Sequence, residues 1–299
     1  MKMTQVPILI TWDIDPNACF TVAQKRESLQ AALNLCRESG IAATFFFVAQ
    51  EAILYPSQIA EMKQAGHTIG CHGLIHGDDE EYIRMTREEQ RAHIEQATRL
   101  LEEVAAVPIQ VFRSPRVKVS SVTLELLAEC GYLADSSVCS QRLDLLSSNP
   151  INVGWLTAPR LPYHPNRNSA FRPGDLGILE IPISALMLPF ISTTMYILGL
   201  RVAKALFRIL YIEARRRGKP IVYLAHPEEF GPQSWPVFRW SDLSLKSLRT
   251  HGLMIRKHWN ESDPESRLQM NRALFSYMAT FPDVHFVTMR EYILQGDWS

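Results

Sequence analysis

The sequence predicts an α/β fold in which parallel strands, joined by helices, close into a barrel. Short apolar runs alternate with helical patterns through most of the 299 residues, and this alternation is typical of a parallel sheet. Seven or eight strand–helix repeats in about 290 residues favour a barrel over an open sheet. Several predicted strands also end in polar residues suited to catalysis, which is where barrel enzymes carry their active sites.

Eight apolar runs have the length and the flanking residues of strands. The run at 42–48, Ala-Ala-Thr-Phe-Phe-Phe-Val, is apolar on both faces, as a strand inside a parallel sheet should be. The predicted strands are 6–13, 42–48, 67–72, 109–113, 132–135, 178–183, 220–226 and 284–288.

Six helical patterns separate these runs. The pattern at 86–106 begins with Thr86 and has Glu89 three positions later, which is a capping-box arrangement. Gly66 and Gly131 each follow a helical stretch, where a C-terminal glycine is expected. The predicted helices lie near 20–40, 50–66, 86–106, 119–131, 193–217 and 263–281.

The composition is that of a globular protein without a dominant charge. Hydrophobic residues make up 46% of the chain, enough for a large core. The 31 basic residues balance 31 acidic ones, which argues against nucleic acid as a partner. The five cysteines form no C-x-x-C pair, so we expect buried thiols in a reducing compartment rather than disulfides.

The organisation of the chain leads to three expectations. No apolar stretch near the start is long enough for a signal peptide, so we expect a cytoplasmic protein. No run of about 20 apolar residues would form a spanning helix. We expect one catalytic domain over 1–299, in which the long segments 138–177 and 227–262 border the substrate site.

Two short motifs carry the candidate metal ligands. The first predicted strand ends in Asp13-Ile14-Asp15, and His72 and His76 lie four positions apart at the end of the third. One carboxylate and two imidazoles form a three-ligand set for a divalent cation, with positions left open for water and substrate. The second carboxylate could act as a general base. Taken alone, each motif also fits a solvated strand end or ordinary polar histidines.

Three further polar residues end predicted strands. Arg113 could pair with a catalytic carboxylate and hold its orientation. His226, which precedes Pro227, has a side chain suited to acid catalysis. Asp135 ends the strand at 132–135. Each could be structural if taken singly, but their shared place at strand C-terminal ends favours one common site.

Taken in order, these motifs resemble those of the polysaccharide deacetylase family, also called NodB-homology domains or carbohydrate esterase family four. The resemblance covers about residues 6–230 and implies a distorted (β/α)7-type barrel, completed by an extension over 231–299. The five matching motifs are Thr11-Trp12-Asp13-Ile14-Asp15, His72-Gly73-Leu74-Ile75-His76, Arg113-Ser114-Pro115-Arg116, Asp135-Ser136-Ser137 and Leu224-Ala225-His226-Pro227.

The resemblance implies metal-dependent hydrolysis of an amide. Asp15, His72 and His76 would hold a divalent metal, with zinc expected first and cobalt, nickel or manganese as alternatives. Asp13 would be the general base, and His226 would protonate the leaving amine. The adjacent Asp-Asp pair of the family is interrupted here by an isoleucine, so either carboxylate could be the metal ligand.

The resemblance also implies supporting roles. Arg113 would tether the base, and Asp135 would orient the acid, although the aromatic residue usual in the fourth motif is absent. Pro115 and Arg116 would contact the substrate, and a backbone N–H after Pro115 would stabilise the oxyanion. Arg116 stands where the family often has tyrosine, and it could contact a phosphate or carboxylate of the substrate.

An apolar segment near the C-terminal half carries a basic stripe. Arg201, Lys204, Arg208 and Arg215 follow helical spacing within an otherwise apolar helix. A helix packed on the barrel and a helix lying on an anionic membrane surface both fit this pattern. The second alternative predicts peripheral contact with the inner membrane face through 190–217.

The sequence therefore predicts a metal-dependent deacetylase that acts on an N-acetyl amino sugar in a polysaccharide or lipid-linked glycan precursor. A deformylase or allantoinase-like amidase on the same scaffold is one alternative, and release of formate would mark the deformylase. A non-catalytic carbohydrate- or lipid-binding protein is another, but it should lack a base, a ligand or an acid.

Overall fold

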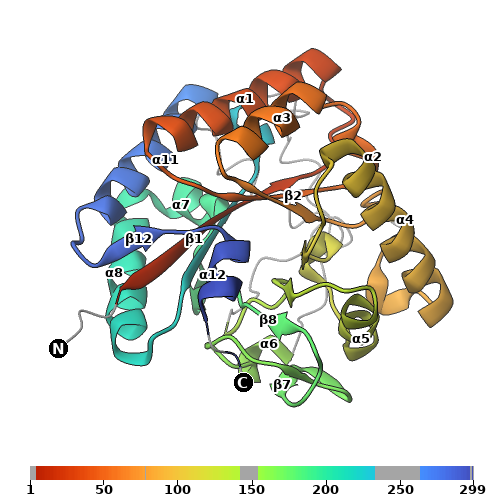
Figure 1. Cartoon of the computed structure of the whole chain (residues 1–299). Coiled ribbons are helices and arrows are strands. Elements are labelled where there is room, and N and C mark those ends of the chain that lie inside the picture. Colours follow the sequence, from red (N-terminus) through yellow and green to blue (C-terminus); the bar gives the residue numbers. More distant parts are fainter. Residues whose placement is uncertain (1–4, 78, 142–153, 233–262, 297, 299) are drawn as a thin grey trace, which may run out of the picture.

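The computed structural model describes residues 5–77, 79–141, 154–232, 263–296 and 298. Parallel strands form a curled sheet that is surrounded by helices (Figure 1). Parts of the two predicted insertions, at 142–153 and 233–262, lie outside the described residues.

The main sheet contains eight strands, and each coincides with one of the predicted runs. Their bounds are β1 (Val6–Ile14), β2 (Thr44–Phe47), β3 (Thr68–Cys71), β4 (Val111–Phe112), β5 (Ala134–Asp135), β8 (Leu179–Glu180), β11 (Ile221–Ala225) and β12 (Val284–Phe286). The strand order is β11-β1-β2-β3-β4-β5-β8, and β12 also pairs with β1. The pairings are parallel, which confirms the predicted α/β class.

The sheet curls into a distorted barrel that single backbone contacts bridge between β8 and β11. The Ser184 N–H donates to the Val222 carbonyl at 3.2 Å, and the Leu224 N–H donates to the Phe190 carbonyl at 3.4 Å. Regular ladder pairing does not join β8 to β11 in the described part of the chain. The predicted barrel is therefore confirmed in an incompletely paired form.

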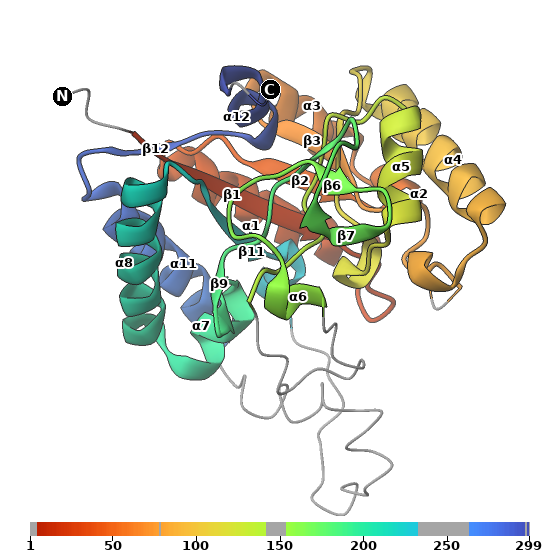
Figure 2. The ribbon, with the colours of Figure 1, turned by 90° about the horizontal axis from the view of Figure 1, so that it is seen from below.

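An outer layer of helices covers the sheet (Figure 1). Their bounds are α1 (Val22–Glu38), α2 (Ala49–Ala52), α3 (Pro56–Gln64), α4 (Arg87–Ala105), α5 (Ser121–Glu129), α6 (Gly154–Thr157), α7 (Ser192–Leu198), α8 (Leu200–Arg217), α11 (Pro264–Ala279) and α12 (Met289–Gln295). Figure 2 shows α8 and α11 side by side along one flank, where they pack on each other. The capping box predicted for Thr86 and Glu89 is present at the start of α4.

Two of the predicted helices are each divided in two. Pro56 has no N–H and takes the first position of α3, so the pattern at 50–66 breaks just before it. Gly199 has φ 87 and ψ 158, a conformation open to glycine alone among common residues. The pattern at 193–217 therefore separates into α7 and α8.

Short elements fill the connections. Two small hairpins are formed by β6 (Pro165–Asn166) with β7 (Ser169–Pro173) and by β9 (Ala185–Leu186) with β10 (Leu188–Pro189). In the described part of the chain, three 3₁₀ turns follow strands or loops, namely η1 (Tyr82–Arg84), η2 (Pro115–Val117) and η3 (Pro227–Phe230). Of these, η2 and η3 lie directly after site motifs.

The core is built around β1, which is buried on both faces. Ile8, Leu9, Ile10 and Trp12 are fully buried, as is the polar Thr11 between them. Parallel pairing aligns the ends of the strands, with Cys71 opposite Phe112 and Phe112 opposite Asp135. Residues that follow these positions therefore meet at one edge of the barrel.

The burial of the cysteines agrees only in part with the prediction from the sequence. No disulfide joins the five cysteines, all of which lie among the described residues. Cys36, Cys71 and Cys139 are buried as predicted, while Cys130 is half-buried and Cys19 is exposed. Cys19 lies in an exposed turn before α1, and this location explains the difference.

Candidate active site

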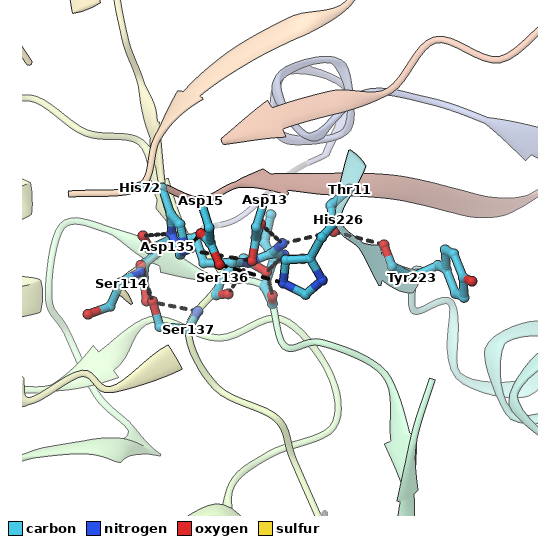
Figure 3. Close-up of polar contacts among 12 residues, drawn as sticks. Thr11, Asp13, Asp15, His72, Ser114, Asp135, Ser136, Ser137, Tyr223 and His226 are labelled. Carbon is cyan, nitrogen blue, oxygen red and sulfur yellow. Dashed lines mark hydrogen bonds and ion pairs between the residues drawn. The ribbon is translucent and has the colours of Figure 1, made fainter. Parts of the chain in front are cut away.

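Three side chains converge beyond the C-terminal ends of β1 and β3. The Oδ1 atom of Asp15 lies 3.2 Å from Nε2 of His72 and 3.6 Å from Nε2 of His76. One ligand atom from each of these residues lies within 4.8 Å of the other two. In Figure 3, Asp15 and His72 point toward each other from different strands. The fold thus brings the three predicted metal ligands together.

The chemistry of this cluster fits a divalent cation. Among the described residues, Oδ1 of Asp15 is buried without a hydrogen-bond partner, which is unfavourable unless another group binds it. Burial raises the pKa of Asp15, but His72, His76 and His226 hold it well below its ordinary value, so the carboxylate is charged. Two imidazoles and one carboxylate, with open positions, suit zinc and related metals.

The two histidines differ in their proton affinity. Burial lowers the pKa of His76, which favours the neutral ring that binds metals. Burial would also lower the pKa of His72, but Asp13 and Asp15 raise it, so a cation binding there would displace a proton. The Nδ1 of His72 lies 2.7 Å from the Arg113 carbonyl. Because a carbonyl only accepts, Nδ1 carries the proton and Nε2 is left for the cation.

The predicted tether between Arg113 and Asp13 is formed. Arg113 is fully buried, and its Nη1 donates to Oδ1 of Asp13 at 2.8 Å and to Oγ1 of Thr11 at 2.9 Å. Its Nε and Nη2 donate to the carbonyl and hydroxyl of Ser136, both at 2.9 Å. The other carboxylate oxygen of Asp13 faces the cluster, 3.8 Å from Nε2 of His72.

His226 lies on the other side of the cluster, and Glu229 holds it there. Its Nε2 is 3.9 Å from Oδ2 of Asp15, and its Nδ1 is 3.3 Å from Oε1 of Glu229. Glu229 also accepts hydrogen bonds from Ser192 at 2.7 Å and Tyr196 at 3.0 Å. Burial alone would lower the pKa of His226, but Glu229, with help from the site aspartates, raises it to about 10.

Asp135 does not have the predicted contact with His226. No hydrogen bond or ion pair joins these two side chains among the residues that the structure describes. Asp135 instead accepts from the Ser137 hydroxyl at 2.7 Å and backbone N–H at 3.1 Å, and it is the register partner of the buried Glu180. The Ser137 hydroxyl in turn accepts from the Ser114 N–H at 2.8 Å (Figure 3). Asp135 therefore supports the loop after Arg113.

The loop of the third motif contacts the turn between the two predicted ligand histidines, His72 and His76. A Cβ atom on Gly73 would lie 2.6 Å from Cγ of Pro115. Arg116 and Val117 have φ of 58 and 55, and His76 has φ of 55. Left-handed backbone is rare for such residues and is often found at functional sites. Pro115 is buried and Arg116 half-buried, so these predicted substrate residues border the site.

Sequence reasoning missed two carboxylates of this site. Glu229 follows His226 by three positions, and Glu80 follows His76 by four. This spacing, a short turn after a motif histidine, was the available signal. A pocket also runs beside Asp13 and Asp15 between α1 and η3, and its other lining residues include Phe20, Tyr55 and Glu228.

Known proteins resemble the chain in sequence over its first part and in fold over nearly all of it. The family model for polysaccharide deacetylase matches residues 2–134, which include the first three motifs. The comparison with curated proteins finds no match. A protein from Mycobacterium smegmatis assigned to the polysaccharide deacetylases is 18% identical, with a TM-score of 0.63, over 98% of this chain and 90% of that one.

Two further solved structures extend the likeness in fold. Puue allantoinase is 16% identical, with a TM-score of 0.60, over 98% of this chain and 90% of that one. The Bc1960 peptidoglycan N-acetylglucosamine deacetylase is 13% identical, with a TM-score of 0.52, over 99% and 92%. At these identities the structures establish the fold alone. The sequence match agrees with the family resemblance: residues 2–134 match the polysaccharide deacetylase family model, and the chain shares its fold with these solved structures.

Proposed function

We propose that this protein is a metal-dependent hydrolase that removes the N-acetyl group of an amino sugar. The observation that carries the proposal is the convergence of the Asp15–His72–His76 cluster with a tethered Asp13 on one side and His226 on the other. The family match supports amide hydrolysis on a carbohydrate.

The base of the reaction is Asp13. A divalent cation held by the three ligands would polarise the amide carbonyl and lower the pKa of a water molecule. Asp13 takes the proton from the attacking water, whose oxygen forms the new bond to the carbonyl carbon. Arg113 occupies Oδ1 of Asp13 at 2.8 Å, so the other oxygen is directed at the water. The buried guanidinium also holds the carboxylate in one orientation.

The acid of the reaction is His226. When the C–N bond breaks, its Nε2–H protonates the leaving nitrogen, so that acetate and a free amine result. Glu229 holds Nδ1 of the ring at 3.3 Å, which orients the imidazolium and keeps it protonated. The backbone N–H of Arg116, the residue after Pro115, stabilises the developing oxyanion. Pro115 and Arg116 border the bound sugar.

The proposal has a direct test in metal content and product. Elemental mass spectrometry should find nearly one zinc or related ion per wild-type chain, and little in Asp15→Ala or His72→Ala. Acetate release from amino-sugar precursors should follow the metal. Formate release would favour the deformylase alternative. A wild type that stays metal-free after reconstitution with zinc, cobalt, nickel and manganese would refute the hydrolase and favour a binding protein.

The proposed substrate is a polysaccharide or lipid-linked glycan precursor, and the outer face of α8 offers a surface for contact with an anionic membrane. Val202, Ile209 and Ile212 are 38%, 50% and 49% exposed, and the exposed Arg201 and Arg208 flank them. An apolar strip bordered by arginines fits acyl chains and anionic headgroups. Among the described residues, no helix combines the length and apolar composition that crossing a bilayer requires.

The basic stripe predicted from the sequence is only partly on this face. Lys204 is half-buried, with its Nζ 5.0 Å from the centre of the Tyr277 ring. Arg215 is exposed but pairs with Asp283 at 3.0 Å. The proposed contact therefore depends on Arg201 and Arg208.

Flotation with vesicles tests this contact. Wild type should float with vesicles that contain phosphatidylglycerol, and Arg201→Glu combined with Arg208→Glu should not. Arg99→Glu combined with Arg172→Glu makes the same charge change on exposed arginines elsewhere. Equal flotation of both variants, or none by wild type, would remove the membrane contact from the proposal without affecting the hydrolase.

A further inference from the structure

The turn between the two ligand histidines presents several backbone N–H groups that no strand or helix satisfies. His72 follows β3, and four residues later His76 must return to the same point to share a ligand cluster. Gly73 and His76 take left-handed conformations, with φ of 80 and 55. Such a turn needs an acceptor from elsewhere, because unpaired N–H groups in a partly buried turn are unfavourable.

One buried carboxylate supplies that acceptor. Glu80 is fully buried, and its Oε1 accepts from the Leu74 N–H at 2.7 Å. Its Oε2 accepts from the Ile75 N–H at 2.7 Å and from the His76 N–H at 2.6 Å. Three consecutive N–H groups thus converge on a single side chain, in the manner of a backbone anion nest.

Two further side chains hold the Glu80 carboxylate in place. Oε1 of Glu80 also accepts from the Tyr82 hydroxyl at 3.3 Å and lies 3.0 Å from Nδ1 of His93 on α4. A Cβ atom on Gly73 would lie 3.0 Å from Oε2 of Glu80 and 2.6 Å from Pro115. The turn is therefore confined between Glu80 on one side and the loop of the third motif on the other.

We infer that Glu80 is a positioning residue for the metal site, which holds the 74–76 backbone so that His72 and His76 reach one ion together. This inference rests on the proposed function, because it concerns the ligands of that site. Glu80 contacts no proposed ligand atom itself. It acts through the backbone N–H of His76 and of the two residues before it.

The test compares Glu80→Gln with Glu81→Gln. A glutamine at 80 keeps the size of the side chain but turns an NH₂ group toward N–H donors, so one or two of the three bonds are lost. Glu81 is an equally close control, since it is buried and pairs with Lys118 and Arg84 but does not bond the turn. Its replacement should lower stability without disturbing the ligands.

The first readout is the zinc affinity of the apoprotein, measured by competition with a chromophoric chelator. Glu80→Gln should bind zinc roughly 10- to 100-fold more weakly than wild type, the usual effect of losing an outer support of a metal ligand. Glu81→Gln should bind as wild type does. Equal affinity in folded Glu80→Gln and wild type would overturn the inference. Should Glu80→Gln fail to fold, Glu80→Asp, which keeps the charge but is one methylene shorter, carries the same comparison.

The second readout needs no metal. Hydrogen exchange of a peptide that spans 73–77 in the apoprotein should be slow in wild type and Glu81→Gln and fast in Glu80→Gln. If wild type binds no metal while this difference persists, the proposed hydrolase fails and the hold of Glu80 on the turn stands. If exchange is the same in all three proteins, Glu80 does not hold the turn.

Discussion

Replacing Arg113 by Met should strongly destabilise the protein because it leaves the charge of Asp13 buried without its guanidinium partner. Asp13 is only 3% exposed, and Arg113 is its ion-pair partner at 2.8 Å. Removing one partner of a buried pair costs about 3–5 kcal/mol. The other partners lose less. The Thr11 hydroxyl still donates to the Tyr223 carbonyl, and the Ser136 hydroxyl still donates to that of Ile181.

A double-mutant cycle isolates this effect. We expect Arg113→Met to lower the free energy of unfolding by about 3–5 kcal/mol. A domain whose free energy of unfolding is about 5–15 kcal/mol can remain folded after such a loss. Asp13→Asn should also be destabilising, since it leaves the guanidinium buried. The double variant should lose less than the sum of the two, with a coupling of roughly 1–3 kcal/mol. Urea unfolding, followed by circular dichroism, measures the free energy of unfolding of the metal-free wild type, both single variants and the double variant. Additivity within about 0.5 kcal/mol would refute the reasoning.

Three other changes separate the roles of the site residues. His226→Gln should reduce kcat by roughly 10²- to 10⁴-fold while the metal content stays at the wild-type level, and loss of metal would contradict its role as acid. Gly73→Ala should lower both stability and zinc affinity more than Gly131→Ala, because both have positive φ but only the first would meet Pro115 at 2.6 Å; equal losses would show that the contact is unimportant. In metal-free protein the pKa of His226 is raised from 6.5 to about 10. The charged ring therefore contributes fully to the stability of the folded protein below pH 6.5, and this contribution is lost as the pH rises to 10. Urea titrations over this range should show a decline in wild type that Glu229→Gln lacks, and equal slopes would exclude Glu229 as the cause.

The strands could be predicted because burial on both faces leaves a clear sequence signal. The run at 42–48 contains three consecutive phenylalanines, all fully buried in β2 or at its end. The helical patterns were less decisive. Hydrophobic spacing continues through Pro56 and Gly199, but the missing N–H of the first and the conformation of the second divide the helices. At these two positions the backbone properties of a single residue, rather than the hydrophobic periodicity, determined where a helix ends.

The site could be predicted where its residues end strands, because parallel pairing brings such ends together whatever their separation in sequence. Asp13 and Arg113 lie 100 positions apart and meet at 2.8 Å. No comparable rule predicts the direction in which each side chain points after its strand ends. Asp135 turns toward Ser137 rather than toward His226, because the chain after β5 bends back over its carboxylate. The positions of strand ends therefore identify candidate site residues, but they do not predict which side chains these residues will contact.

Local turn chemistry supplies what the strand ends do not. Glu80 and Glu229 each follow a site histidine within four residues, and each bonds back into the turn that it belongs to. A carboxylate so close in sequence needs little chain ordering to reach its partner, since the entropy of closing a short loop is small. Glu80 thus binds the backbone of His76, and Glu229 binds the ring of His226, near the point where both rings face Asp15. The barrel brings the motifs together, and the turns after them determine whether the groups can work as one site.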